Sequence, residues 1–397
     1  MSEHSFQPPA SAADAAETRP YRQCSVSVLD TLDDPNMLFD EQGRCHYYHD
    51  YMRAERAYVR TGEAGRRELE QMVDRVKQDG RKLPYDCIIG VSGGVDSTYL
   101  AYLVKQLGLR PLAVHFDNGW NSELAVTNVE NIVNRLGIDL FTYVVNWEEF
   151  RDLQLAYLRA SVVDIEVVSD HAIMATMWRT AAKHGVRHIL SGTNIVTEHV
   201  LPPHWIYNKS DHVNLRAIHK AFGRVPLDTY PLVDWRVKRY MHGVRGIRTR
   251  EPLNLVPYDK AEIKRVITSE LGWRDYGGKH YESIWTRFYQ GYILPTKFGI
   301  DKRKAHLSNL IFSRQITKEH ALAELAEPMY EPALLRQDMD FVLKKLELTA
   351  AEFERIMRLP PRAHREFDYE RPIYDDFPVL RPFRGAIAGF RRLVSAS

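Results

Sequence analysis

The run from Ser92 to Ser97, with the sequence SGGVDS, has residue types and a spacing that suit the binding of a polyanion. Adjacent glycines let a backbone approach phosphates closely, and hydroxyls add short hydrogen-bond donors. A helix beginning here would add unpaired N–H groups and a positive dipole end. The Walker spacing GxxxxGK[ST] is absent. The predicted pyrophosphate cradle therefore comprises Ser92, Gly93, Gly94, Val95, Asp96 and Ser97.

Asp96 is the one acid in this run. A carboxylate repels phosphates unless Mg²⁺ bridges it to the triphosphate, which makes Asp96 a candidate catalytic and Mg²⁺-binding residue through ATP. The alternative is that Asp96 caps the helix by accepting hydrogen bonds from backbone N–H groups. The sequence leaves both roles open.

Two further segments end predicted strands and are expected beside the cradle. Phe116 and Asp117 would border the adenosine, with Asp117 accepting from a ribose hydroxyl, although Asn118-Gly119 is also typical of a simple turn. Gly192 and Thr193, in the run SGTN, would approach ATP closely. The predicted acceptor pocket comprises Asn194, Glu198 and Trp205 from this region, and His280 and Glu282 from a later one, although an exposed loop explains the first group nearly as well.

Basic residues are in excess between positions 274 and 306, with seven lysines and arginines against three acids. Cations held near the departing pyrophosphate would stabilise the charge that builds there in the transition state. A solvated surface is the alternative for any one of them. The candidate catalytic cations are Lys279, Arg287, Lys302, Arg303 and Lys304.

Composition places the chain among ordinary globular proteins. Of its 397 residues 44% are hydrophobic and 27% are charged, and the net charge is +2. This balance does not favour nucleic acid as a partner. The polar first twenty residues and the lack of a long apolar run predict a cytoplasmic protein without membrane insertion. Three cysteines are too few for a disulfide framework.

Strand and helix patterns alternate from residue 87 to residue 191. Strands are expected at 87–91, 111–116, 140–145 and 188–191, and helices at 97–107, 122–136 and 169–184. Alternation of this kind predicts an α/β fold with a doubly wound parallel sheet and a ligand at the carboxyl ends of its strands. The expected divisions are a disordered tail (1–20), a cysteine-bearing module with a helix (21–80), an ATP-binding domain (81–257) and a mainly helical region (258–397).

Several strings together resemble the N-acetyl sugar amidotransferases, which are PP-loop ATP pyrophosphatases of bacterial surface-polysaccharide biosynthesis. The resemblance spans roughly residues 21–357, and its carriers are the runs at 30–35, 39–41, 92–97, 191–194, 277–283 and 297–311. It implies conversion of an acetamido group on a nucleotide-linked sugar into an acetamidino group, with ammonia and ATP and through an adenylylated intermediate. It also implies two partners, a glutaminase and a cyclase-like ammonia channel.

The chain departs from this family at its N-terminal cysteines. The resemblance implies a family pattern of two CxxC pairs, which suits tetrahedral zinc. In this chain the second cysteine of each pair is replaced: Ser27 stands three residues after Cys24, and Tyr48 three residues after Cys45. Cys24 and Cys45 remain candidate ligands in a degenerate zinc-ribbon-like module, but Zn²⁺ is not expected because Ser and Tyr hydroxyls are poor ligands for it.

Two rival functions remain at this point. One is a tRNA-modifying PP-loop enzyme, either a thiolase or a lysidine-type ligase, which the weak net charge and the poorly placed cysteines disfavour. The other is a non-catalytic scaffold for the glutaminase and channel proteins, which the intact SGGVDS run disfavours.

Overall fold

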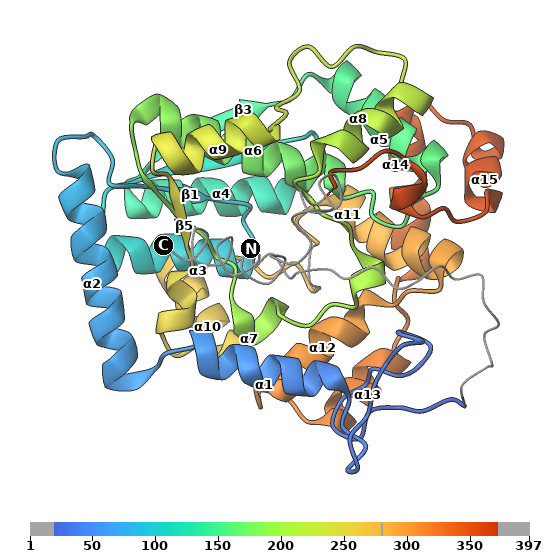
Figure 1. Cartoon of the computed structure of the whole chain (residues 1–397), viewed down its shortest axis with the longest axis horizontal. Helices are drawn as coiled ribbons and strands as arrows, with labels where there is room; N and C mark the ends of the chain where they lie inside the picture. Colours follow the sequence, from blue (N-terminus) through green and yellow to red (C-terminus); the bar gives the residue numbers. More distant parts are fainter. Residues whose placement is uncertain (1–19, 279–280, 372–397) are drawn as a thin grey trace, which may run out of the picture.

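Five parallel strands form one sheet in the order β3-β2-β1-β4-β5 in this computed structural model, which describes residues 20–278 and 281–371 (Figure 1). The strands are β1 (Cys87–Gly90), β2 (Pro111–Asp117), β3 (Asp139–Val144), β4 (His188–Leu190) and β5 (Arg248–Arg250). The central strand β1 pairs on one side with β2, Ile88 opposite Leu112, and on the other with β4, Ile88 opposite Ile189. The predicted α/β class with a doubly wound parallel sheet is confirmed.

Helices cover both faces of the sheet, and alternate residues of β1 face opposite layers. Cys87 and Ile89 pack among α2 (Gly62–Gly80), α3 (Val95–Gln106), α4 (Glu123–Leu136) and α10 (Lys260–Leu271). Ile88 packs on the other face against α6 (Val167–His184), which is itself covered by α9 (Trp235–Arg239) and a π-helix (Tyr240–Val244). Burial on both faces explains why this strand is a continuous apolar run rather than an alternating one.

The remaining helices pack beside and below the sheet, with α14 and α15 at the opposite side of the molecule from α2 (Figure 1). None of the described helices combines the length and the apolar character that a membrane span requires. The helices outside the two layers that cover the sheet are α1 (His46–Tyr58), α5 (Trp147–Ala160), α7 (Ile195–Glu198), α8 (His212–Phe222), α11 (Ile284–Phe288), α12 (Lys302–Phe312), α13 (Lys318–Ala326), α14 (Pro332–Leu346) and α15 (Ala350–Arg358). A π-helix follows α11 at Tyr289–Phe298, and short 3-10 turns lie at Pro203–Trp205, Pro252–Leu255 and His364–Glu366.

The predicted elements of the sheet region match the observed ones closely. The segment 202–257 is rich in Trp, Tyr, Pro and Arg and has little periodic pattern, which predicts little regular structure, yet it contains α8, α9 and β5. The apolar pattern over 52–80 predicts one helix, but the structure has two, because the chain is extended at Val59 and Thr61. The region after 258 is helical as predicted, while the proposed domain boundaries stay predictions and residues 1–19 of the predicted tail lie outside the described residues.

Trp120, just after β2, joins the sheet to the C-terminal helices. Its fully buried indole stacks on that of Trp285 in α11, with ring centroids 5.3 Å apart, and its Nε1 donates to Gln154 Oε1 in α5 at 3.0 Å. These contacts belong to a hydrophobic cluster that runs from Cys24 and Tyr51 near the N-terminus to Phe353 in α15. The carboxyl edge of the sheet is thereby fixed to the helical region.

We expect Trp120→Ala to lower the free energy of unfolding by about 3–5 kcal/mol, because it removes a buried indole and leaves Gln154 without its donor. Trp235→Ala is the matched control, since that indole is 52% exposed, and its effect should stay within about 0.5 kcal/mol. Urea denaturation of both variants measures the difference. Equal losses of unfolding free energy in the two variants would contradict the role of Trp120 in packing the sheet against the C-terminal helices.

Candidate active site at the carboxyl edge of the sheet

The loop from β1 to α3 turns at Gly93, which has a left-handed φ of +83°. Two donors hold its carbonyl: Trp273 Nε1 at 2.7 Å and the Tyr276 hydroxyl at 2.8 Å. A Cβ at this position would lie 2.8 Å from the Tyr276 hydroxyl oxygen and 2.9 Å from the Ala125 carbonyl oxygen. Glycine is therefore required here for both its conformation and its size.

The two serines of the run face each other across the loop. Their hydroxyl oxygens lie 3.1 Å apart, Ser92 Oγ accepts from the Gly94 amide at 3.2 Å, and Ser97 Oγ donates to the Gly94 carbonyl at 3.1 Å. Gly94 is the N-cap residue of α3, so the first N–H groups of this helix have no partner within it. The loop thus presents ordered hydroxyls and a helix N-terminus, a combination that suits phosphate.

The loop after β4 lies directly against the cradle. A Cβ on Gly192 would lie 3.1 Å from the Asp96 carbonyl carbon and 3.2 Å from the Ser97 amide nitrogen. Thr193 is ordered by Ser191, whose Oγ accepts from its amide at 3.2 Å. The winding of the sheet reverses between β1 and β4, and this is the position where open α/β sheets bind ligands.

Asp96 is held by side chains from two other segments. Its Oδ1 accepts from the Tyr258 hydroxyl and, at 3.4 Å, from Asn194 Nδ2. Burial and the neighbouring carboxylate raise the pKa of Tyr258, which therefore acts as a donor. Asn194 is 2% exposed and also caps α7 by accepting from the Thr197 amide at 3.0 Å. This placement favours a positioning role for Asn194 over direct acceptor binding.

Glu282 lies beside the cradle although it is distant from it in the sequence. A Cβ on Gly94 would lie 3.4 Å from its Oε1. Its carbonyl accepts from the Ser122 amide at 2.9 Å, next to a bridge between Asn121 and Ser283. The predicted residues Lys279 and His280 lie outside the described residues. Of the predicted acceptor residues that the structure describes, Glu282 and Asn194 both lie beside the cradle, Glu282 next to Gly94 and Asn194 next to Asp96.

The other predicted cations are each paired with an acid. Arg287 Nε lies 2.7 Å from Asp338 Oδ2, and Lys302 Nζ lies 3.0 Å from Glu166 Oε2. The two that follow Lys302 are paired as well, Arg303 with Asp301 and Lys304 with both Asp30 and Asp33. Their charges are neutralised locally, which favours structural roles. Their action on phosphate stays a prediction, and the site proposed below does not depend on it.

The other acceptor candidates, Glu198 and Trp205, differ in exposure. Trp205 is 1% exposed and belongs to the hydrophobic core, which favours packing over acceptor binding. Glu198 is exposed at the end of α7 and contributes to the raised pKa of Tyr258 after burial and Asp96. Glu198 therefore lies on the side of the cradle where Tyr258 and Asp96 meet.

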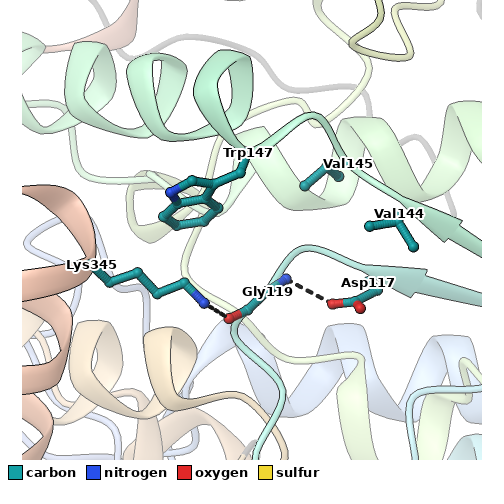
Figure 2. A pocket seen from close by; sticks show the side chains of 6 residues that line it. All are labelled: Asp117, Gly119, Val144, Val145, Trp147 and Lys345. Carbon is teal, nitrogen blue, oxygen red and sulfur yellow. Dashed lines mark hydrogen bonds between the residues drawn. The ribbon is translucent and has the colours of Figure 1, made fainter.

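A cavity of about 230 Å³ lies beyond the ends of β2 and β3 (Figure 2). Asp117 lines it and accepts from the Gly119 amide at 2.8 Å, while Phe116 is stacked on Tyr143 with centroids 5.8 Å apart. Lys345 from α14 donates to the Gly119 carbonyl, and its ammonium lies 4.7 Å from the Trp147 ring centroid. Burial lowers the pKa of Lys345. The lining residues are Asp117, Gly119, Val144, Val145, Trp147 and Lys345.

Cys24 and Cys45 lie together in the N-terminal module. The Cys45 amide donates to Cys24 Sγ at 3.2 Å, and the Cys45 side chain lowers the pKa of Cys24 to about 5. Ser27, in place of a partner thiol, has its hydroxyl 4.0 Å from Cys45 Sγ. Among the residues that the structure describes, no three His, Cys, Asp or Glu side chains gather as metal ligands. The pair fits a degenerate ribbon held by hydrogen bonds.

Sequence reasoning missed four side chains that build this site. Trp273 and Tyr276 fix the Gly93 carbonyl, Tyr258 holds Asp96, and Lys345 closes the cavity beyond β2. Each lies more than one hundred residues from its partner. The sequence carries no local signal for them.

Comparisons with known proteins agree with parts of this description. Residues 282–381 match the family model described as "LPS biosynthesis protein WbpG-like, C-terminal domain". Two tRNA(Ile)-lysidine synthases are also similar: that of Chlamydia pneumoniae is 37% identical over 70 residues (17% of this chain, 22% of the relative), and one of Thermus thermophilus is 32% identical over 106 residues (26% and 20%). The chain spans about a fifth of the length of these curated relatives.

Among solved structures, an NH3-dependent NAD synthetase from Campylobacter jejuni overlaps with a TM-score of 0.31 at 12% identity, over 71% of this chain and 94% of that one. The match at 282–381 confirms the predicted resemblance to a family of surface-polysaccharide biosynthesis. The chain combines an α/β fold built on a five-stranded parallel sheet with a C-terminal segment that matches a WbpG-like domain, and the first matched residue is Glu282.

We expect Gly93→Ala to weaken ATP binding by about tenfold or more, because the added methyl group displaces Tyr276 or Ala125 and misaligns the loop. Gly137→Ala is the matched control: its φ of +55° is also left-handed, but nothing lies within 4 Å of its Cβ position. Both variants carry a backbone strain of about 1–2 kcal/mol. Calorimetric titration with ATP separates them, and equal affinities would contradict the steric requirement at Gly93.

Proposed function

We propose that this protein is an ATP-dependent amidotransferase that converts an acetamido group of a nucleotide-linked sugar into an acetamidino group. The observation that carries the proposal is the position of Glu282 beside the cradle, with its Oε1 3.4 Å from where a Cβ on Gly94 would lie. Glu282 is also the first residue of the segment that matches a lipopolysaccharide-biosynthesis domain. A polysaccharide-related domain therefore adjoins the loop expected to hold ATP.

The first step transfers AMP to the acceptor. The amide oxygen attacks the α-phosphorus of ATP, a new P–O bond forms, and the bond to the bridging oxygen breaks with release of pyrophosphate. Negative charge grows on the departing group, where the N-terminal amides of α3 are donors. The amides are ordered by the loop, whereas the hydroxyls of Ser92 and Ser97 donate to phosphate after turning away from their partners within the loop.

The second step replaces oxygen by nitrogen. Ammonia adds its lone pair to the activated carbon, the new ammonium group loses a proton to solvent, and the nitrogen lone pair forms the C–N double bond as the C–O bond breaks and AMP leaves with the bonding electrons. A carboxylate such as Glu282 can accept a hydrogen bond from the acceptor N–H and orient the group. The acceptor otherwise has a poorly electrophilic carbon and a very poor leaving group, which is why ATP is consumed.

Mg²⁺ and the partners are further parts of the proposal. Asp96 would hold Mg²⁺, an oxygen-seeking cation that neutralises triphosphate charge when bound. Its carboxylate is ordered by Tyr258 and Asn194 and belongs to the first turn of α3, which suits that role. A glutaminase and a cyclase-like channel protein would supply ammonia, as the family resemblance implies.

A second candidate function is an RNA-directed ligase of the lysidine-forming type. The similarity to two tRNA(Ile)-lysidine synthases favours it. The match covers about a fifth of those relatives and lies in a chain whose C-terminal part matches a different family. We therefore place it second.

We expect Asp96→Asn to lower the rate of AMP formation by about 10²-fold, because it removes the charge while keeping an oxygen for Tyr258. The exposed Asp74→Asn on α2 is the control and should leave the rate unchanged. The assay contains ATP, ammonium and a panel of nucleotide-linked diacetamido sugars. Mass spectrometry should show a product lighter than the acceptor by the difference between O and NH.

Two outcomes would contradict the proposal. Pyrophosphate release that is unchanged in Asp96→Asn would remove the cradle from catalysis. AMP formation that requires RNA and ignores every sugar would favour the second candidate function. Circular dichroism of each variant shows that the fold is intact.

A further inference from the structure

A second cavity, of about 290 Å³, lies at the amino edge of the sheet, opposite the cradle. His188 begins β4 and Arg248 begins β5, and because these strands are parallel both first residues lie at one edge. α2 contributes from one side and the turn after the π-helix from the other. The lining residues are Arg75, Asp79, Arg187, His188, Val244, Arg245, Gly246, Arg248 and Arg250.

This cavity has a large excess of positive charge. Five of its lining residues are arginines, and among the described residues that line it Asp79 is the one acid. Asp79 already faces two donors, with Oδ2 2.8 Å from His188 Nε2 and Oδ1 4.0 Å from Arg187 Nη1. One carboxylate cannot balance five guanidinium groups.

Arg250, a half-buried arginine of the cavity, is also surrounded by positive charge. Burial and the neighbouring Arg75 and Arg248 lower the pKa of Arg250. Its Nε donates to His188 Nδ1 at 3.2 Å, so the proton of this imidazole is on Nε2 and faces Asp79. His188 therefore accepts from Arg250 as a neutral ring and relieves none of the repulsion.

Arg248 is fixed in orientation by the backbone. Its Nη1 donates to the His242 carbonyl at 2.7 Å. A guanidinium that is already ordered loses little side-chain entropy when it binds an anion, and its planar fork matches the oxygens of a phosphate. The cavity thus offers two half-buried, hydrogen-bonded guanidinium groups, those of Arg248 and Arg250, and the exposed arginines add positive charge around them.

We infer that this arginine-lined cavity is a binding site for a phosphate-class anion, separate from the ATP site and beyond the proposed activity. Its volume admits a phosphate or pyrophosphate group with part of its carrier. A free phosphorylated ligand and a phospholipid headgroup present this same chemistry, and Val244, 74% exposed at the rim, is compatible with either source.

The test titrates inorganic pyrophosphate into wild-type protein and into the double variant Arg75→Gln/Arg187→Gln. Both arginines are exposed, so their replacement should leave the fold intact, which a thermal melt verifies. Arg66→Gln is the matched control, an exposed arginine on α2 paired with Glu63 at 2.6 Å. We expect two binding events in the wild type and the control, and a loss of about 10- to 100-fold in one of them in the double variant.

Two further experiments identify the source of the anion and separate this inference from the proposed function. Gly93→Ala should weaken the other event and leave this one unchanged. Co-sedimentation with phosphatidylglycerol vesicles that is lost in the double variant would assign the anion to a lipid headgroup, and pyrophosphate binding without vesicle binding would assign it to a free ligand. Unchanged pyrophosphate and vesicle binding in the double variant would overturn the inference, as would a defect confined to RNA binding.

Discussion

The left-handed turn at Gly93 is the constraint from which the candidate active site follows. Its carbonyl is fixed by Trp273 and Tyr276, which lie 180 and 183 residues further along the chain. Because that carbonyl is held by two donors, the path of the loop between β1 and α3 is fixed. The approach of Gly192 to Asp96 and the hydrogen bond from Tyr258 then depend on the same loop path. The glycine at position 93 allows the left-handed turn, and the hydrogen bonds from Trp273 and Tyr276 stabilise it.

The parts of the fold that could be predicted from the sequence are those with local causes. An apolar run followed by two glycines and a helix pattern indicated β1, the cradle and α3 to within a few residues. β5 could not be found in this way, because Arg248-Thr249-Arg250 has no apolar pattern and is a strand only through its pairing with β4. α8 was missed for a related reason. It lies in a segment rich in Trp, Tyr, Pro and Arg, and its packing against α5 decides its structure.

Counting charges along the chain proved a weak guide to the site, because the count contains no information about partners. The excess of cations between 274 and 306 suggested a phosphate-binding group. In the structure Arg287 is neutralised by Asp338, 51 residues away, and Lys302 by Glu166, 136 residues away. A buried or half-buried cation needs such a counterion. The arginine-lined cavity at the amino edge is the opposite case: its residues are scattered over α2 and the segments that begin β4 and β5, and no run in the sequence indicated it.

The two edges of the sheet favour anions by different physical means, and the difference fits different tasks. The donors that the protein itself provides in the cradle are backbone amides and hydroxyls, which are neutral dipoles held in place by the loop. Neutral donors stabilise a charge that develops in a transition state, yet they bind a departed pyrophosphate less tightly than guanidinium groups would, because charge-assisted hydrogen bonds are roughly twice as strong. The proposed function requires release of pyrophosphate in every turnover, and this weaker binding would serve it. The cavity at the amino edge, with five arginines and one acid, suits tight binding of the inferred anion. The affinity of this cavity for the anion should fall steeply with salt, because salt screens ionic interactions.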